Sequence, residues 1–275
     1  MLSKCVPRLF SFLLVVFVGA SPVGSTASAD ELKPLWPDAA GIELFLQKAK
    51  VVERHKLGSG ITNPDKVTLE LNGVTRQAIY KKVDQSYDSW QFEVAAYRLD
   101  KLLEVGRVPP TVERSIGGRR GCLQLWVEGT TLAKFEGTPT DLDAWHLQVS
   151  VMWLFDDLIA NIDRHMNNAI VTPDFALAFI DNSKTFRSHK ELLNGLNHGV
   201  TGTHARYWLV PYDKDRQEYP TRYPPALIER LRALTKQDIK KALSPHIYGN
   251  ALDRVLERRE LILKRLGEMA APAAR

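Results

Sequence analysis

The sequence predicts an α+β protein with two lobes, a small β-rich lobe followed by a mainly helical one. Between residues 57 and 127, short strand-like runs surround a single helical segment. After residue 142, apolar residues recur at intervals of three and four, which is typical of helices. The change falls between Gln124 and Thr131. We therefore expect a first lobe at 30–125, a second lobe at 126–270 and a cleft between them.

The composition excludes several classes of protein. The chain has 275 residues, of which 44% are hydrophobic and 25% charged, and its net charge is +5. Its mean hydropathy is -0.21. These values are typical of a globular protein, and they exclude a disordered chain, a collagen-like chain and a multi-span membrane protein. The mildly basic charge predicts a solvated surface, and we expect no nucleic-acid partner.

The N-terminal residues are typical of a secretory signal. Lys4 and Arg8 precede the apolar run Leu9–Ala20, and small residues follow at Ala27-Ser28-Ala29. We expect residues 1–29 to be removed on export to the periplasm or out of the cell. The apolar run is too short for a comfortable membrane span, so we expect no stable span after cleavage. An uncleaved anchor is the alternative.

Cleavage would leave a single cysteine. Cys5 lies in the predicted signal, and Cys122 lies in a strand-like run. No internal disulfide is then possible in the mature chain, and we expect Cys122 to be a buried structural thiol.

The first lobe is expected to begin with a helix. Asp30 to Arg54 starts as a proline-rich arm and continues as an amphipathic helix with apolar residues at Ile42, Leu44, Phe45 and Ala49. Strands are predicted at 66–71 and 77–83, joined by the turn sequence Asn72-Gly73. A helix is predicted from Ser89 to Glu104, and further strand follows between residues 108 and 127.

The second lobe is expected to be built on one long buried helix, Leu142 to Ile162. A short hairpin follows, with strands at 169–172 and 176–180 joined by Pro173-Asp174. Three more helices are predicted at about 225–234, 236–242 and 251–266.

Three polar residues flank this hairpin. The start of the first strand meets the end of the second in an antiparallel hairpin, so Asn168 and Asp181 should lie side by side. Asp163 lies one loop upstream on the same edge. Oxygen ligands of this kind suit Mg²⁺ whose other ligands are phosphates and water, and Asp163 could accept or orient the proton of an acceptor hydroxyl. Alternatively, these residues only cap turns and strand ends, with Asp181 paired to Arg187.

A cation for nucleotide phosphates is also expected. Lys81 lies within a predicted strand on the face of Ile79 and Val83, so it would need a partner, and Glu93 in the following helix could supply one. The turn Gly58-Ser59-Gly60 precedes the strands and could cover phosphates with backbone N–H groups. Solvated surface lysines are the alternative.

These motifs resemble those of known kinases. Asp163-Arg164-His165 with Asn168, followed by Asp181-Asn182, resembles the catalytic and metal motifs of phosphoinositide 3- and 4-kinase-like proteins. The runs Phe92–Leu103 and Arg107–Val112 resemble the secretory-pathway kinases of the Golgi casein kinase and Four-jointed group. The resemblance covers about residues 58–187, although Ser183 stands where the family usually has glycine.

The resemblance implies a bilobal protein-kinase-like fold and a role for each motif. It implies that Lys81 binds the nucleotide phosphates with Glu93 as its helix partner. It implies Asp163 as the catalytic aspartate. It also implies that the metal ligands are Asn168 and Asp181, and that the nucleobase lies beside Gln124–Val127, including Gln124 and Trp126.

The sequence therefore predicts an exported atypical kinase. It would transfer a phosphoryl group from ATP, or another nucleoside triphosphate, bound with Mg²⁺ or Mn²⁺, to a hydroxyl of a protein, sugar or lipid head group. Three alternatives stay open: a nucleotide-binding pseudokinase acting as an interaction module, a metal-dependent phosphohydrolase using Asp163, His165 and Asp181, and transfer of a whole nucleotide.

Overall fold

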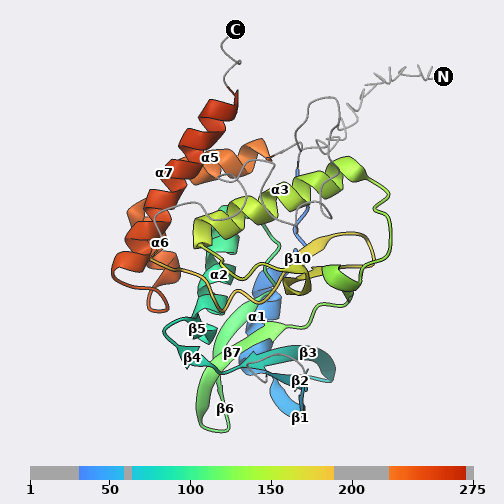
Figure 1. Cartoon of the computed structure of the whole chain (residues 1–275). Helices are drawn as coiled ribbons and strands as arrows, with labels where there is room; N and C mark the ends of the chain where they lie inside the picture. The colour runs from blue at the N-terminus through green and yellow to red at the C-terminus, as the bar shows by residue number, and fades with distance from the viewer. Residues whose placement is uncertain (1–30, 59–63, 189–222, 271–275) are drawn as a thin grey trace, which may run out of the picture.

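The computed structural model describes residues 31–58, 64–188 and 223–270. The predicted signal at 1–29 and Gly60 of the glycine turn lie outside these residues. Figure 1 shows a β-rich N-lobe at the bottom and a mainly helical C-lobe above it. The α+β, two-lobed fold class predicted from the sequence is confirmed.

Within the described residues, five antiparallel strands form the N-lobe sheet in the order β1-β2-β3-β7-β6. Their bounds are β1 (Lys50–Lys56), β2 (Asp65–Leu71), β3 (Val74–Lys81), β6 (Thr111–Ile116) and β7 (Arg119–Leu125). The predicted turn at Asn72-Gly73 joins β2 to β3. Both turn residues have positive φ angles, 53° and 79°, as a two-residue hairpin turn requires.

Helix α1 (Ala39–Lys48) packs its buried face against this sheet. The predicted helix is wrong beyond Lys48, because β1 begins at Lys50. Arg54 instead projects from β1, and its Nη2 donates to Oδ2 of Asp65 in β2 at 2.6 Å. The helical spacing of apolar residues ends at Ala49, and the β-branched pair that follows favours a strand.

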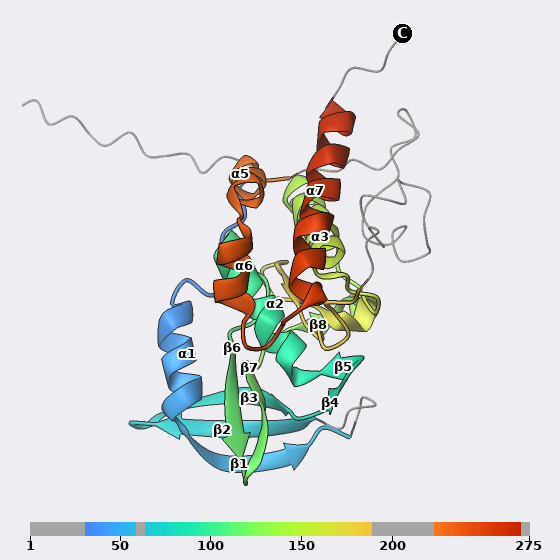
Figure 2. The ribbon, with the colours of Figure 1, turned by 90° about the vertical axis from the view of Figure 1, so that its left-hand side faces the viewer.

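A short hairpin, β4 (Asp84–Gln85) and β5 (Asp88–Ser89), leads into α2 (Trp90–Leu103). The hydroxyl of Ser89 caps the helix by accepting a hydrogen bond from the backbone N–H of Gln91 at 3.2 Å. The predicted helix is confirmed to within a residue. Figure 2 shows α2 between the N-lobe sheet and the C-terminal helices. Most of its buried apolar side chains belong to the hydrophobic core of the C-lobe, whereas Trp90 and Val94 pack with Cys122 of β7, so α2 connects the two lobes.

Helix α3 (Leu142–Ile159) is the buried axis of the C-lobe, and its side chains from Trp145 onward are buried. It begins at Asp141, whose Oδ1 accepts from the backbone N–H of Ala144 at 2.9 Å. The three predicted C-terminal helices are confirmed as α5 (Pro225–Ala233), α6 (Lys236–Leu243) and α7 (Asn250–Ala270).

The predicted hairpin is also confirmed. Strands β9 (Ala169–Val171) and β10 (Leu177–Phe179) pair antiparallel, and β8 (Thr130–Thr131) adds to β9. The 3₁₀ helices η1 (Leu132–Lys134) and η2 (Met166–Asn168) flank this small sheet. The chain passes from the N-lobe sheet to the C-lobe sheet between Leu125 and Thr130.

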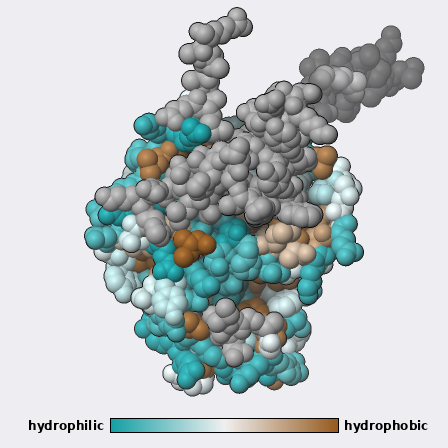
Figure 3. Space-filling view, viewed as in Figure 1, coloured by the Kyte–Doolittle hydropathy of each residue, from teal (hydrophilic) through white to brown (hydrophobic). Residues whose placement is uncertain are grey.

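Figure 3 shows that the described part of the viewed face is mostly hydrophilic, with hydrophobic residues in small separate groups. No helix in the described parts of the chain has both the length and the hydropathy needed to cross a bilayer.

Candidate active site

An ion pair links the N-lobe sheet to helix α2. Nζ of Lys81, at the end of β3, lies 2.5 Å from Oε1 of Glu93, in the first turn of α2. The Glu93 side chain is fully buried and that of Lys81 is 15% exposed. Burial alone would lower the pKa of Lys81, but the charges of Glu93 and Asp181 raise it above its ordinary value. The ammonium is therefore charged at neutral pH.

Glu93 is also held from β7. Nε2 of Gln124 lies 3.3 Å from Oε2 of Glu93 and 3.1 Å from Oγ1 of Thr111. Burial raises the pKa of Glu93, and the neighbouring ammonium of Lys81 opposes that shift. Residues of β3, β6, β7 and α2 thus hold the Lys81–Glu93 ion pair in place.

Asp181 brings the C-lobe to the same ammonium. It follows β10 with a left-handed backbone, φ 56°, and its Oδ1 lies 3.3 Å from Nζ of Lys81. The charge of Lys81 lowers the pKa of Asp181, although partial burial opposes the shift. The Asp181 side chain remains 46% exposed, so it stays accessible to a ligand. The pairing of Asp181 with Arg187 is not seen, because Arg187 donates to the backbone carbonyl of Tyr87 at 2.7 Å.

A small pocket, of about 10 Å³, opens beside Lys81 and Asp181. Both lobes contribute to its walls, which are formed by Lys81, Lys82, Val83, Asp88, Trp90, Asp181 and Ser183. Lys81 and Asp181 therefore meet at the boundary between the lobes.

Asp163 and Asn168 lie together in the loop after α3. Nδ2 of Asn168 donates to the backbone carbonyl of Asp163 at 2.8 Å, and the backbone carbonyl of Asn168 accepts from the N–H of Ile180 at 3.1 Å. Asn168 is therefore adjacent to the chain at Asp181, as predicted from the hairpin. The carboxylate of Asp163 is 34% exposed, and its Oδ2 lies 2.9 Å from Nζ of Lys184.

A second polar cluster contacts this loop, and we call it the Arg164 clasp: Arg164, Asp156 and Asn182. Arg164 donates from Nε to Oδ2 of Asp156 at 2.8 Å and from Nη2 to Oδ1 of Asn182 at 2.8 Å. Its Nη1 donates to the backbone carbonyls of Asn168 and Ile180. Burial raises the pKa of Asp156, and the charge of Arg164 opposes the shift. The clasp joins α3 to the loop on both sides of the hairpin.

The donor set fits a divalent ion only if other ligands complete it. Over the ranges that the structure describes, no group of three or more His, Cys, Asp and Glu side chains is placed to hold a metal ion. Asn168 and Asp181 are the oxygen donors predicted from the sequence. The amide nitrogen of Asn168 is engaged by Asp163, so Oδ1 of this residue, which is 3% exposed, is the atom that could bind a ligand. Two protein oxygens plus phosphates and water are a common way to bind Mg²⁺.

The residues predicted to contact a nucleotide lie in different places. Gly58 follows β1 in a left-handed bend, φ 62°. Gln124 is buried beside Glu93. Trp126 follows β7, and Nζ of Lys66 lies 3.7 Å from the centre of its ring. Lys66 is the register partner of Ile79, so it shares the sheet face of Lys81.

Two further sequence expectations concern His165 and Cys122. Nδ1 of His165 accepts from the backbone N–H of Asn167 at 3.3 Å, so this imidazole supports the loop. Cys122 is buried, and burial raises the pKa of its thiol. It is a structural thiol, as expected.

Solved structures resemble the fold of this chain, whereas no protein-family model and no curated protein sequence matches it. The structure of hydra Fam20 with sugar has a TM-score of 0.56 and 16% identity, and covers 84% of this chain and 88% of that one. The Golgi casein kinase has a TM-score of 0.54 and 15% identity, and covers 86% of this chain and 76% of that one.

The chain has a Fam20-like atypical kinase fold. The predicted likeness to the Golgi casein kinase is thereby confirmed at the level of the fold. The likeness to phosphoinositide kinases and to Four-jointed stays a prediction.

The sequence analysis did not predict the contacts of two side chains in this site. Gln124 was expected beside the nucleobase, but its side chain supports Glu93. Lys184 was not singled out, although it contacts Asp163. The available signal was its position: Lys184 is the one charged residue between Asp181 and Arg187.

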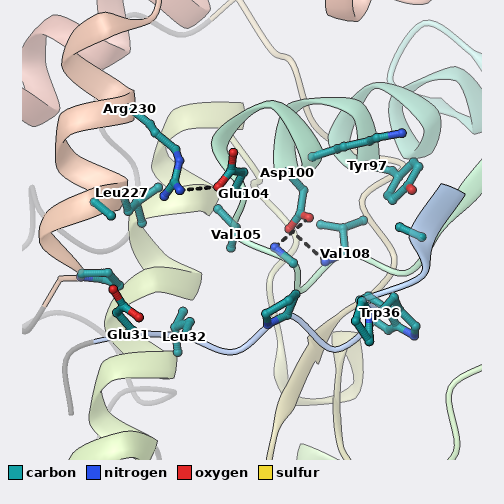
Figure 4. A pocket seen from close by; sticks show the side chains of 17 residues that line it. Glu31, Leu32, Trp36, Tyr97, Asp100, Glu104, Val105, Val108, Leu227 and Arg230 are labelled. Atoms are coloured by element: carbon teal, nitrogen blue, oxygen red, sulfur yellow. Dashed lines mark hydrogen bonds and ion pairs between the residues drawn. The ribbon is translucent and has the colours of Figure 1, made fainter. Parts of the chain in front are cut away.

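A larger pocket, of about 370 Å³, lies away from the cleft. It is formed by the N-terminal arm, the end of α2 and α5, with the Arg230–Glu104 ion pair at one end and Trp36 at the other (Figure 4). The carboxylate of Asp100 accepts three backbone N–H groups there. None of the charged residues of the cleft lines this pocket, so it is separate from the candidate active site.

Proposed function

We propose that the protein is an atypical kinase that transfers the γ-phosphoryl group of ATP, or of another nucleoside triphosphate, to a hydroxyl. The observation that carries the proposal is the meeting of Lys81, Glu93 and Asp181 at 2.5 and 3.3 Å across the two lobes. Phosphoryl transfer depends on positioning and on neutralising phosphate charge. A charged lysine fixed by an acid from α2 and facing an acid of the C-lobe meets that requirement, and the Fam20-like fold supports the same function.

The N-lobe would bind the nucleotide. The ammonium of Lys81 would contact its phosphates, and Glu93 would keep that ammonium in place. We propose that Gly58 and Gly60 lie over the phosphates and that the chain at Gln124 and Trp126 lies beside the base. The cation–π contact of the partly buried Trp126 with Lys66 supports an aromatic wall there.

The C-lobe would hold the metal and the acceptor. Asn168 and Asp181 would bind Mg²⁺ or Mn²⁺, which neutralises charge on the phosphates when it is bound. Asp163, whose carboxylate is 34% exposed, would accept or orient the proton of the acceptor hydroxyl. The acceptor would be a protein, a sugar or a lipid head group.

We also propose that the protein is exported to the periplasm or out of the cell, with residues 1–29 as its signal and lobes at 30–125 and 126–270. The sequence pattern at the N-terminus supports this part of the proposal. A mature chain that begins at Asp30, measured by mass spectrometry, is the expected result, and retention of residues 1–29 would contradict it.

The experiment that tests the activity uses purified protein, Mg²⁺ or Mn²⁺, and ATP labelled at either the α- or the γ-phosphate. We expect the γ-label alone to move to water or to the protein itself, and a chelator to stop the transfer. Asp163→Asn should lower the rate by about 10²–10⁴-fold without changing the melting temperature. Asp174→Asn is the matched control, because Asp174 bonds only its own turn through Thr172.

Each alternative function has its own outcome. Release of the γ-label to water that Lys81→Ala leaves unchanged would indicate a metal-dependent phosphohydrolase. Transfer of the α-label would indicate movement of a whole nucleotide. Binding of nucleotide without product would indicate a pseudokinase. Full turnover by Asp163→Asn, or turnover that continues at the same rate in the presence of the chelator, would contradict the proposed kinase activity.

A further inference from the structure

Lys184 projects from a segment whose backbone is fixed on both sides. Its neighbours Asn182, Ser183 and Thr185 are 0%, 8% and 0% exposed. The carbonyl of Ser183 accepts from the backbone N–H of Ser89 at 2.9 Å, which ties the segment to β5. The Lys184 side chain, in contrast, is 30% exposed. The fold therefore holds the chain still and directs this one long side chain to the cleft.

The ammonium of Lys184 lies among carboxylates of both lobes. Its Nζ is 2.9 Å from Oδ2 of Asp163, and the charges of Asp88 and Asp181 also act on it. The hydrogen bond from Lys184 to Asp163 is the main cause that raises the pKa of Lys184 above its ordinary value, so the group is charged at neutral pH. Lys184 thus supplies a positive charge on the acceptor side of the cleft, whereas Lys81 supplies one on the sheet side.

The Lys184–Asp163 pair adds little to the stability of the fold. Its two side chains are 30% and 34% exposed, and ion pairs this exposed contribute little to stability. An ammonium also carries more N–H donors than Asp163 can occupy. Donors of Lys184 therefore remain for a ligand that approaches Asp163.

We propose that Lys184 is a catalytic residue that donates hydrogen bonds to the phosphoryl group during its transfer. This inference rests on the proposed function, because Asp163 must contact the attacking hydroxyl. The hydroxyl oxygen beside Asp163 then attacks the γ-phosphorus, so the phosphoryl group in transfer also lies close to Asp163. An ammonium 2.9 Å from that carboxylate is within reach of the phosphoryl oxygens.

The step balances without any further reactant. A bond forms between the acceptor oxygen and the γ-phosphorus, and the bond from that phosphorus to the bridging oxygen of the nucleoside diphosphate breaks. The diphosphate leaves with the electron pair of the broken bond, and the acceptor proton passes to Asp163. Lys184 keeps its proton throughout and stabilises the negative charge on the transferring oxygens.

The test compares Lys184→Met and Lys184→Arg with the wild type in Mg²⁺. The measurements are release of γ-labelled phosphate to water, binding of ADP, and binding of ADP with aluminium fluoride, which imitates the phosphoryl group in transfer. For Lys184→Met we expect a rate about 10²-fold lower, unchanged ADP binding and weaker binding of the fluoride complex. Lys184→Arg should restore much of the rate. Lys236→Met is the matched control, because Lys236 pairs with Asp253 at 2.6 Å far from the cleft.

The outcomes separate this inference from the proposed function. Wild-type turnover and unchanged binding of the fluoride complex in Lys184→Met would overturn the role of Lys184 and leave the kinase proposal standing. A wild-type protein that neither binds nor turns over nucleotide would overturn both. A fall in ADP binding equal to the fall in rate, with a lower melting temperature, would show a merely structural role and would also overturn the inference.

Discussion

Two polar clusters contact the loop after α3. One consists of the charged residues of the cleft, Lys81, Glu93, Asp163, Asp181 and Lys184, and the other is the Arg164 clasp. They differ in which side chains remain accessible. In the clasp, Arg164 is 5% exposed and Asp156 is fully buried. In the cleft, Asp181 is 46% exposed and Asp163 is 34% exposed. The hydrogen bonds of Arg164 all go to protein atoms, including two backbone carbonyls.

The difference shows which charges hold the fold and which can act on a ligand. A buried charge whose donors are all used by protein atoms cannot bind anything else without breaking the structure. A half-exposed carboxylate can exchange its lysine partner for a metal or a substrate at small cost to stability. The motif Asp163-Arg164 therefore contains one partly exposed carboxylate and one buried guanidinium, side by side in the sequence.

The largest expected effect concerns the clasp. Arg164→Met removes one partner of a buried ion pair and leaves Asp156 without its cation. We expect the free energy of unfolding to fall by about 3–5 kcal/mol. Urea denaturation measures this directly.

The matched control for the clasp is Arg120→Met. Arg120 pairs with Glu113 at 2.7 Å, but the two side chains are 68% and 34% exposed, so we expect a much smaller loss than in Arg164→Met. Equal stability losses in the two variants would break the distinction between the clusters.

A smaller effect is expected on the pH dependence of stability. Because the charge of Lys81 lowers the pKa of Asp181, the ionised carboxylate stabilises the fold above its unfolded pKa. That stabilisation is lost as the pH falls through the folded pKa of Asp181. Asp181→Asn should therefore be less stable than the wild type at pH 7, by less than about 1 kcal/mol because the group is half-exposed.

Denaturant unfolding at several pH values checks this prediction. The difference between wild type and Asp181→Asn should shrink below about pH 4. A difference that stays constant from neutral to acid pH would mean that Asp181 is not ionised against Lys81, and would remove the contrast with Asp156, whose pKa burial raises.

Much of the fold followed from periodicity, because its elements carry clear local signals. The spacing of apolar residues in α2 and α3, the Asn72-Gly73 turn and the hairpin around Pro173-Asp174 each predict their own structure. The strand β1 did not follow, because only one of its seven residues is even partly buried. A strand with almost no buried face lacks the alternation that distinguishes it from a helix.

The candidate site was harder to predict where long-range contacts decide it. The hairpin geometry brings Asn168 and Asp181 together, and this is local. The contact of Asp181 with Lys81 joins residues 100 positions apart, and Lys184 meets Asp163 only because the segment after Asp181 returns to the loop. Gln124 lies on β7, which pairs with β3. This pairing decides which residues lie near Lys81 and Glu93, and the spacing of residues in the sequence does not reveal it.

The central claim is that the ammonium of Lys81, shared by Glu93 and Asp181, binds the phosphates of a metal-bound nucleotide. Calorimetric titration of ATP in Mg²⁺ into the wild type, Lys81→Met and Lys236→Met tests it most directly. Lys236 is the control, because it pairs with Asp253 at 2.6 Å and does not line the pocket beside Lys81. We predict binding that a chelator abolishes, that Lys81→Met weakens at least about 10-fold and that Lys236→Met leaves unchanged. Equal affinities in all three proteins would contradict the account.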